Sequence, residues 1–140
     1  MKLDPSAFIA DPELIHALKK RSTTIVCKED CTLFRQGEAA KGLYILDLGE
    51  ADLTMMSATG QVIASVQASA GSLLGLPGIV GNEPYSLTAH VRGGARLSYV
   101  VRDDFTDLMQ SEPQLSLKIL QVLAAEVRSA RRALTELQTL

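Results

Sequence analysis

The residues whose types and spacing most suggest chemistry lie in the stretch 71–90, GSLLGLPGIVGNEPYSLTAH. Four glycines and two prolines accompany a single formal charge there, Glu83. Glycine-rich loops bind phosphates through backbone N–H groups, and phosphate sites usually add a lysine or arginine that strengthens the contact. This stretch has neither, so it could hold an anion, hold another ligand, or simply turn the chain.

Motifs for catalysis are missing from the sequence. It contains no GxSxG, no HExxH and no GxxxxGK[ST]. Asp103 and Asp104 form a pair of carboxylates, but their position before an apolar helical pattern is typical of a helix cap. We therefore predict that the protein is not an enzyme and has no catalytic residues.

Candidate metal ligands are few and scattered. Cys27 and Cys31 have CxxxC spacing, whereas iron–sulfur clusters generally need four ligands. His16 and His90 have no paired ligand nearby in the sequence. We expect no metal site and no cofactor, with the two cysteines as reduced thiols in or beside strands.

The totals are those of one globular domain. The chain has 140 residues, of which 46% are hydrophobic and 21% charged, and its net charge is −2. This charge favours neither nucleic acid nor an anionic membrane. No apolar run is long enough to span a bilayer, and the N-terminal twenty residues do not resemble a signal peptide. We expect a cytoplasmic protein with no membrane partner.

The elements that must position the glycine-rich stretch change along the chain. Asp11 and Pro12 begin a short amphipathic helix. A series of short runs rich in β-branched and aromatic residues follows, which is typical of a β-sandwich or barrel. These runs are residues 23–27, 31–36, 42–49, 51–58, 61–69, 85–91 and 95–101.

The C-terminal part is predicted to be helical. Residues 102–110 form a short helix, and a long segment without glycine runs from Pro113 to Leu140. Apolar residues on that segment have the 3, 4, 3, 4, 3 spacing of a coiled-coil seam. We predict that this seam joins two copies of the chain, the alternative being a helix packed on its own domain. The seam consists of Leu120, Leu123, Val127, Ala130, Leu134 and Leu137.

The segment 33–53, LFRQGEAAKGLYILDLGEADL, resembles the roll of the cyclic-nucleotide-binding domains, especially those of the catabolite-activator-like and fumarate-nitrate-regulator-like bacterial regulators. The resemblance implies a mainly β fold with flanking helices. We expect a double-stranded β-helix, or jelly roll, over residues 1–112, with an N-terminal helix and a short following helix. The long dimerisation helix, 113–140, belongs to the same domain.

The glycine-rich stretch lies where that family has its phosphate-binding cassette. The family motif there is similar to Gly-Glu-Leu-Ala-Leu followed by Arg-Ser/Thr-Ala-Thr, in which the Glu holds the ribose hydroxyl and the Arg the cyclic phosphate. In this chain Leu76 takes the place of the Glu and Tyr85 that of the Arg. The residues placed by the resemblance at the pocket are Gly75, Leu76, Pro77, Gly78, Tyr85, Ser86 and Thr88.

The two replacements predict that cAMP and cGMP are not bound in the standard way, because a buried phosphate without a counter-charge is costly. Three interpretations of the pocket stay open. It binds a less charged small molecule, it is filled by Leu76 and Tyr85, or it holds an anion through backbone N–H groups near Gly75 and Gly78.

We therefore expect a regulatory ligand-sensing module that forms a homodimer. The alternatives are a ligand-free interaction module with a filled pocket, or the sensor part of a transcriptional regulator. In relatives a DNA-binding domain follows the long helix, and this chain stops at Leu140. Its basic cluster, Arg128, Arg131 and Arg132, is interpreted as the solvated flank of the seam, so DNA binding by this chain alone is not expected.

Overall fold

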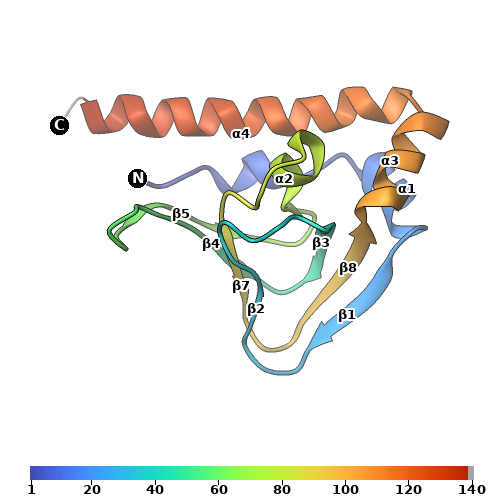
Figure 1. The fold of residues 1–140 in the computed structure, drawn as a ribbon, viewed down its shortest axis with the longest axis horizontal. Coiled ribbons are helices and arrows are strands. Elements are labelled where there is room, and N and C mark those ends of the chain that lie inside the picture. The colour runs from blue at the N-terminus through green and yellow to red at the C-terminus, as the bar shows by residue number, and fades with distance from the viewer. Residues whose placement is uncertain (139–140) are drawn as a thin grey trace.

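Residues 1–138 are described by a computed structural model, which contains two four-stranded antiparallel sheets. One sheet has the strand order β1-β8-β3-β6 and the other β2-β7-β4-β5, so strands distant in sequence lie side by side. This is the jelly roll that the sequence predicts (Figure 1). The strands are β1 (Thr23–Cys27), β2 (Cys31–Phe34), β3 (Gly42–Leu48), β4 (Ala51–Met56), β5 (Val62–Ala68), β6 (Leu73–Leu74), β7 (Thr88–Val91) and β8 (Ala95–Val101).

Side chains along the strands alternate between buried and partly exposed positions, so each strand turns one face toward a shared core. In β4 the burial alternates from Ala51 to Leu53, and in β7 it alternates from Ala89 to Val91, as expected for strands with one face inward. β3 is the exception, since Leu43, Ile45 and Leu46 are all fully buried. One of its faces lines the roll interior and the other is covered by helices, including α2 and α3.

Within residues 1–138, four helices and one 3-10 turn pack against the roll: η1 (Pro5–Phe8), α1 (Pro12–Lys19), α2 (Leu76–Gly81), α3 (Arg102–Ser111) and α4 (Gln114–Gln138). α1 begins as predicted, with the Asp11 carboxylate accepting from the backbone N–H of Glu13 at 2.8 Å. α3 begins at Arg102, where the predicted short helix begins, but Asp103 and Asp104 lie within its first turn instead of capping it. There they still interact favourably with the helix dipole.

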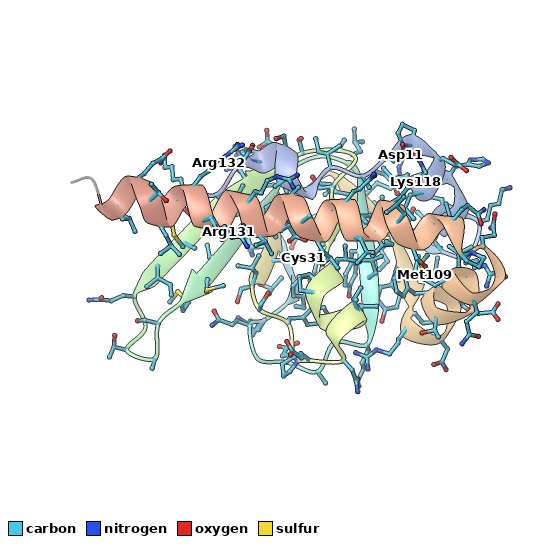
Figure 2. All side chains as sticks on the ribbon, turned by 90° about the horizontal axis from the view of Figure 1, so that it is seen from above. Asp11, Cys31, Met109, Lys118, Arg131 and Arg132 are labelled. Carbon is cyan, nitrogen blue, oxygen red and sulfur yellow. The ribbon has the colours of Figure 1, made fainter. Side chains whose placement is uncertain are left out.

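α4 runs along the whole length of the roll, above the N-terminal segment (Figure 1). Two polar contacts fasten it there. Lys118 Nζ lies 3.0 Å from the Asp11 carboxylate, and Ser129 Oγ accepts from the backbone N–H of Asp4 at 2.6 Å. Figure 2 shows Lys118 beside Asp11 in the view from above. The last two residues of the predicted long helix, 139 and 140, lie outside the described residues.

The stripe of α4 that packs on the roll is not the predicted seam. Its spacing is 4, 3, 4, 3, 4, one residue out of phase with the seam. All of its members but one are at least 95% buried, and the exception is a half-buried glutamate. This inward stripe consists of Leu115, Ile119, Val122, Glu126, Ser129 and Ala133.

Candidate functional site

The cassette region folds around a short helix that the sequence did not predict. Gly75 precedes α2 with φ +92°, a left-handed conformation that favours glycine. A Cβ added at Gly75 would lie 2.7 Å from the Tyr85 ring, so the missing side chain also makes room for that ring. Pro77 then takes a position in the first turn of α2, where no backbone donor is needed. The glycines and prolines therefore shape a helical turn around Tyr85.

Tyr85 is buried in the core. Its ring stacks on Phe34 with ring centroids 3.9 Å apart and an interplanar angle of 18°. Its hydroxyl donates to the carbonyl of Gly42 at 2.6 Å. Burial raises the pKa of Tyr85, so the hydroxyl stays protonated and remains a donor. The side chain thus occupies the interior with its polar end satisfied.

Leu76 is fully buried as well, and little space remains beside it. The cavity under α2 has a volume of about 10 Å³, which is about enough for one water molecule. Gly75, Pro77, Gly78 and Ser86 line this cavity, whereas Leu76 and Tyr85 belong to the hydrophobic core.

Thr88, the last of the residues placed at the pocket by resemblance, faces another neighbour. Its hydroxyl accepts from the backbone N–H of Gln36 at 3.0 Å, which joins the start of β7 to the turn after β2. The structure therefore brings four of the seven candidate residues together around a cavity, whereas Leu76 and Tyr85 pack in the core and Thr88 binds the turn after β2.

A cation does lie near the cassette, but on its outer side. Arg102, at the start of α3, donates from Nη2 to the carbonyls of Ala40, at 2.5 Å, and Gly78, at 3.3 Å. Its Nη1 donates to the side chain of Asn82, the left-handed residue that ends α2. Arg102 is thus committed to two backbone carbonyls and one side-chain amide, and it ties α2 to α3, the helix that leads into α4.

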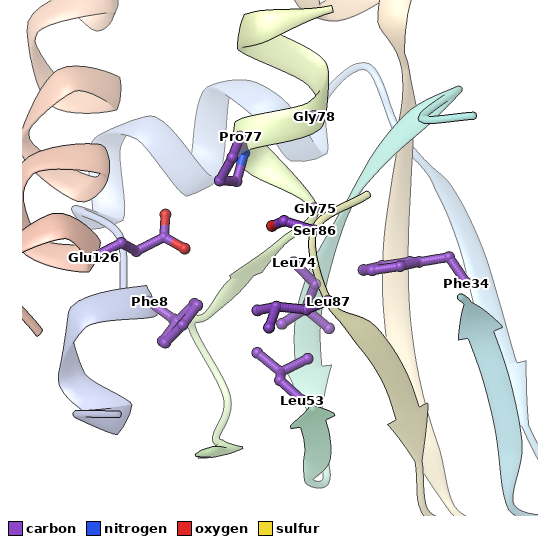
Figure 3. Close-up of a pocket in the computed structure, with 10 residues that line it drawn as sticks. All are labelled: Phe8, Phe34, Leu53, Leu74, Gly75, Pro77, Gly78, Ser86, Leu87 and Glu126. Carbon is purple, nitrogen blue, oxygen red and sulfur yellow. The ribbon is translucent and has the colours of Figure 1, made fainter. Parts of the chain in front are cut away.

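The residue that sequence reasoning missed is Glu126. It lies on the inward stripe of α4 and lines the cavity together with Phe8, Pro77 and Ser86 (Figure 3). Its Oε2 is buried and has no hydrogen-bond partner in the described part of the chain. Desolvation raises the pKa of Glu126 to about 8, so the carboxyl is mostly protonated at neutral pH. The sequence does show a glutamate four residues after Val122 and three before Ser129. This position indicates a buried glutamate only once it is known that this stripe of α4 faces inward.

We expect Glu126 to make the stability of the protein fall as pH rises from about 4.5 to about 8. Within that window the folded carboxyl binds a proton that the unfolded one has lost, so ionisation opposes folding. The Glu126→Gln variant should remove this dependence. The free energy of unfolding of this variant should exceed that of wild type only slightly at about pH 5 and by on the order of a few kcal/mol at about pH 9, since each pKa unit corresponds to about 1.4 kcal/mol. Urea denaturation of both proteins at the two pH values measures this. An equal gain at both values would contradict a raised pKa.

The predicted seam of α4 faces away from the roll. Leu120, Val127 and Leu134 are 57%, 50% and 52% exposed, and Leu137 is similarly exposed. Leu123 and Ala130 are half-buried, at the edge between the seam and the roll. Leu117 extends the same apolar surface toward the start of the helix.

The two cysteines lie at the end of the roll that is farthest from α4 (Figure 1). Cys27 ends β1 and Cys31 begins β2, and their sulfur atoms are 2.7 Å apart as free thiols. Burial, followed by the neighbouring Cys31, raises the pKa of Cys27 to about 11. In residues 1–138 no three His, Cys, Asp or Glu side chains gather as a metal site would require. None of the helices described is long and apolar enough to cross a membrane.

Comparisons with known proteins agree with the fold described above. The family model described as "Cyclic nucleotide-binding domain" matches residues 27–112, more than half of the chain. No sequence among the curated proteins matches.

Several solved structures share the fold. The catabolite activator protein of Thermus thermophilus superposes with a TM-score of 0.79 at 21% identity, covering 96% of this chain and 63% of that protein. The N-terminal domain of a transcriptional regulator from Streptomyces coelicolor A3(2) gives 0.66 at 19% identity, covering 93% of each chain. The sensor domain of the regulator DNR from Pseudomonas aeruginosa gives 0.66 at 21% identity, with 88% and 81% covered. This chain spans less than two thirds of the Thermus protein's length, and identities this low establish the fold alone.

Proposed function

Because the chain belongs to the cyclic nucleotide-binding domain family, we propose that it is a regulatory ligand-sensing module that does not take cAMP or cGMP in the standard way of that family. One observation carries this proposal. Tyr85 occupies the position of the phosphate-binding arginine with its ring stacked on Phe34, inside the core. Leu76, at the position of the ribose-binding glutamate, is fully buried and has no polar side-chain atom. The proposed role is regulatory and not enzymatic.

The electrostatics of the cassette support the same proposal. A cyclic phosphate needs a counter-charge when it leaves water, and a bidentate arginine supplies both charge and hydrogen bonds. Arg102, a cation that contacts the cassette at Gly78, is already bound to Ala40, Gly78 and Asn82. The cavity lining contributes one charged group, the carboxyl of Glu126, whose ionised form would repel a phosphate.

We expect cAMP and cGMP to bind on the order of 1,000-fold more weakly than they bind relatives that keep the Arg and Glu, because two charge-assisted contacts worth about 1.5–3 kcal/mol each are lost. Isothermal titration calorimetry with each nucleotide, up to millimolar concentration, measures this. A relative that keeps both residues serves as the positive control. A dissociation constant in the low micromolar range would overturn the proposal.

The output of the module would be the position of α4. Arg102 connects α2, beside the cavity, to α3, and α3 leads directly into α4. A ligand that binds one arrangement of these helices better than another shifts the population between them. Hydrogen–deuterium exchange of α4 with and without ligand tests this coupling, and unchanged exchange under saturating ligand would count against it.

The exposed seam of α4 supports a homodimer. An apolar stripe on a helix is normally covered, and Leu120, Val127 and Leu134 repeat every seven residues along it. A second copy of the same helix offers a matching stripe, and two-fold pairing is the commonest way to close such an interface.

A second candidate function, an interaction module that binds a partner protein and no small molecule, is favoured by the filled cassette. The small cavity under α2 and the inward ring of Tyr85 are what such a module would have. Melting temperatures measured against cAMP, cGMP and a panel of small metabolites separate the two functions. A saturable rise with one non-nucleotide compound supports the sensor, and no rise with any compound supports the interaction module.

A further inference from the structure

The inward stripe of α4 carries one residue that does not suit it. Its neighbours along the stripe are apolar, except Ser129, whose hydroxyl is satisfied by the backbone of Asp4. Glu126 lies between Val122 and Ser129, and its buried Oε2 has no partner in residues 1–138. A buried carboxyl oxygen without a hydrogen-bond partner is costly, so a glutamate at this position indicates a role beyond packing.

Glu126 stands at the junction of two spaces. On one side is the cavity of about 10 Å³ under α2, and on the other an open groove of about 270 Å³ between α4 and the roll. Phe8, Pro77, Ser86 and Leu87 line both spaces with it. Figure 3 shows the Glu126 carboxylate extending from α4 toward the gap between Phe8 and Pro77. The groove is close to the lower end of the volume range of small-molecule pockets, about 300–1,000 Å³.

The groove is mainly apolar and carries a single acidic group. Apart from the Glu126 carboxyl and the Ser86 hydroxyl, the side chains that line it are apolar. Neither η1, α2 nor the segment before β7 presents a titratable side chain to Glu126, and no charged neighbour contributes to the shift of its pKa. The site therefore offers an apolar surface and an acid that lacks a cation.

We propose that this groove binds a small organic cation, namely a primary amine on an apolar body, with the ammonium group on the Glu126 carboxylate and the Ser86 hydroxyl. The apolar body would lie between Phe8 and Leu87, in contact with Val127. A cation supplies the pairing that the buried carboxyl lacks. This inference rests on the proposed function, since it names the ligand class of the sensor.

The location of the groove would connect the ligand to the seam. Leu123, Val127 and Ala130 line the groove and also belong to the predicted seam. An amine held there touches η1 through Phe8 and α4 through Glu126, so its binding depends on the relative position of η1 and α4. Binding would thus be linked to the arrangement of α4.

Proton balance gives this proposal a distinctive signature. At neutral pH the empty site holds a protonated carboxyl, because desolvation raises the pKa of Glu126 to about 8. The incoming ammonium keeps its three protons, the carboxyl O–H bond breaks, and the released proton goes to the buffer. Binding should therefore release close to one proton per site at about pH 6.5, and progressively fewer above about pH 8.

The test uses the whole chain and three probes of similar shape: 2-phenylethylammonium, 2-phenylethanol and 3-phenylpropionate. Calorimetry in buffers with different ionisation enthalpies gives affinity and proton release together. We expect the amine to bind wild type at least about tenfold more tightly than either analogue. Glu126→Gln should weaken the amine at least about tenfold, abolish proton release, and change the alcohol's affinity less than about twofold. Glu112→Gln makes the same substitution at an exposed position outside the groove and should leave all three affinities unchanged.

Three results would overturn the inference. Equal binding of amine, alcohol and acid would make the groove merely apolar. Amine binding that survives Glu126→Gln would place the cation elsewhere. No binding of the amine, together with a changed dimer constant in Glu126→Gln, would assign the carboxyl to a second copy of the chain.

Failure of the amine leaves the proposed function standing where another compound raises the melting temperature and alters exchange in α4. Micromolar binding of cAMP would defeat the proposed function whatever the amine does.

Discussion

The Tyr85→Ala variant is expected to lower the free energy of unfolding by about 3–5 kcal/mol, the usual loss when a buried aromatic ring is removed. Tyr85 is 5% exposed, stacks on Phe34 and donates to the carbonyl of Gly42. The truncation would leave a cavity beside Gly75, where the backbone has a left-handed conformation and cannot easily collapse. Urea denaturation followed by circular dichroism measures the loss.

Tyr85→Phe is the matched variant, because it keeps the ring and removes only the hydroxyl. We expect it to cost about 1–3 kcal/mol, since the carbonyl of Gly42 loses a donor in a buried setting. A loss below about 1 kcal/mol for Tyr85→Ala would mean that the ring is not packed in solution. The cassette would then be open in solution, and the proposal that cAMP is not bound in the standard way would lose its support.

The Val127→Glu variant is expected to convert a dimer into a monomer. Val127 lies in the middle of the predicted seam and is 50% exposed in the single chain. A symmetric interface would bring two copies of the new carboxylate together without a counter-charge. We expect the dimer dissociation constant to rise at least about 100-fold, which corresponds to about 2.7 kcal/mol. Light scattering after size-exclusion chromatography measures the change.

Gln121→Glu is the control for this experiment, because Gln121 is exposed on α4 outside the seam. It adds the same charge to the same helix and should leave the dimer intact, and circular dichroism of both variants confirms that the fold survives. Wild type that remains monomeric at micromolar concentration would refute the dimer outright.

Much of the fold could be predicted because local patterns and global packing agree. The strand Thr23–Cys27 and the helix from Pro12 follow from β-branched alternation and from the Asp11 cap, which act within a few residues. The six-residue helix α2 could not be predicted in this way. Its glycines and proline are poor helix formers. Packing of Leu76 and Ile79 in the core, and the bonds from Arg102 to Gly78 and Asn82, stabilise it through tertiary contacts.

The candidate site likewise contains residues that the sequence could place and residues that it could not. Gly75, Pro77, Gly78 and Ser86 could be placed near a pocket because a resemblance carries over residue by residue along a continuous segment. Glu126 could not, because it lies forty residues beyond Ser86 and reaches the cavity from another element. Arg102 likewise looked like the ordinary start of a helix, and only its bonds to Ala40 and Gly78 show that it serves the cassette.

By itself the sequence determined the jelly roll, the long C-terminal helix and the absence of an arginine and a glutamate from the cassette, since these depend on residue type and local spacing. Only the tertiary structure decided which stripe of α4 faces the roll. Two stripes offset by one residue both satisfy helical periodicity, and the choice between them depends on the shape of the surface opposite. That choice leaves the buried Oε2 of Glu126 without a hydrogen-bond partner among residues 1–138, and it leaves Leu120, Val127 and Leu134 exposed.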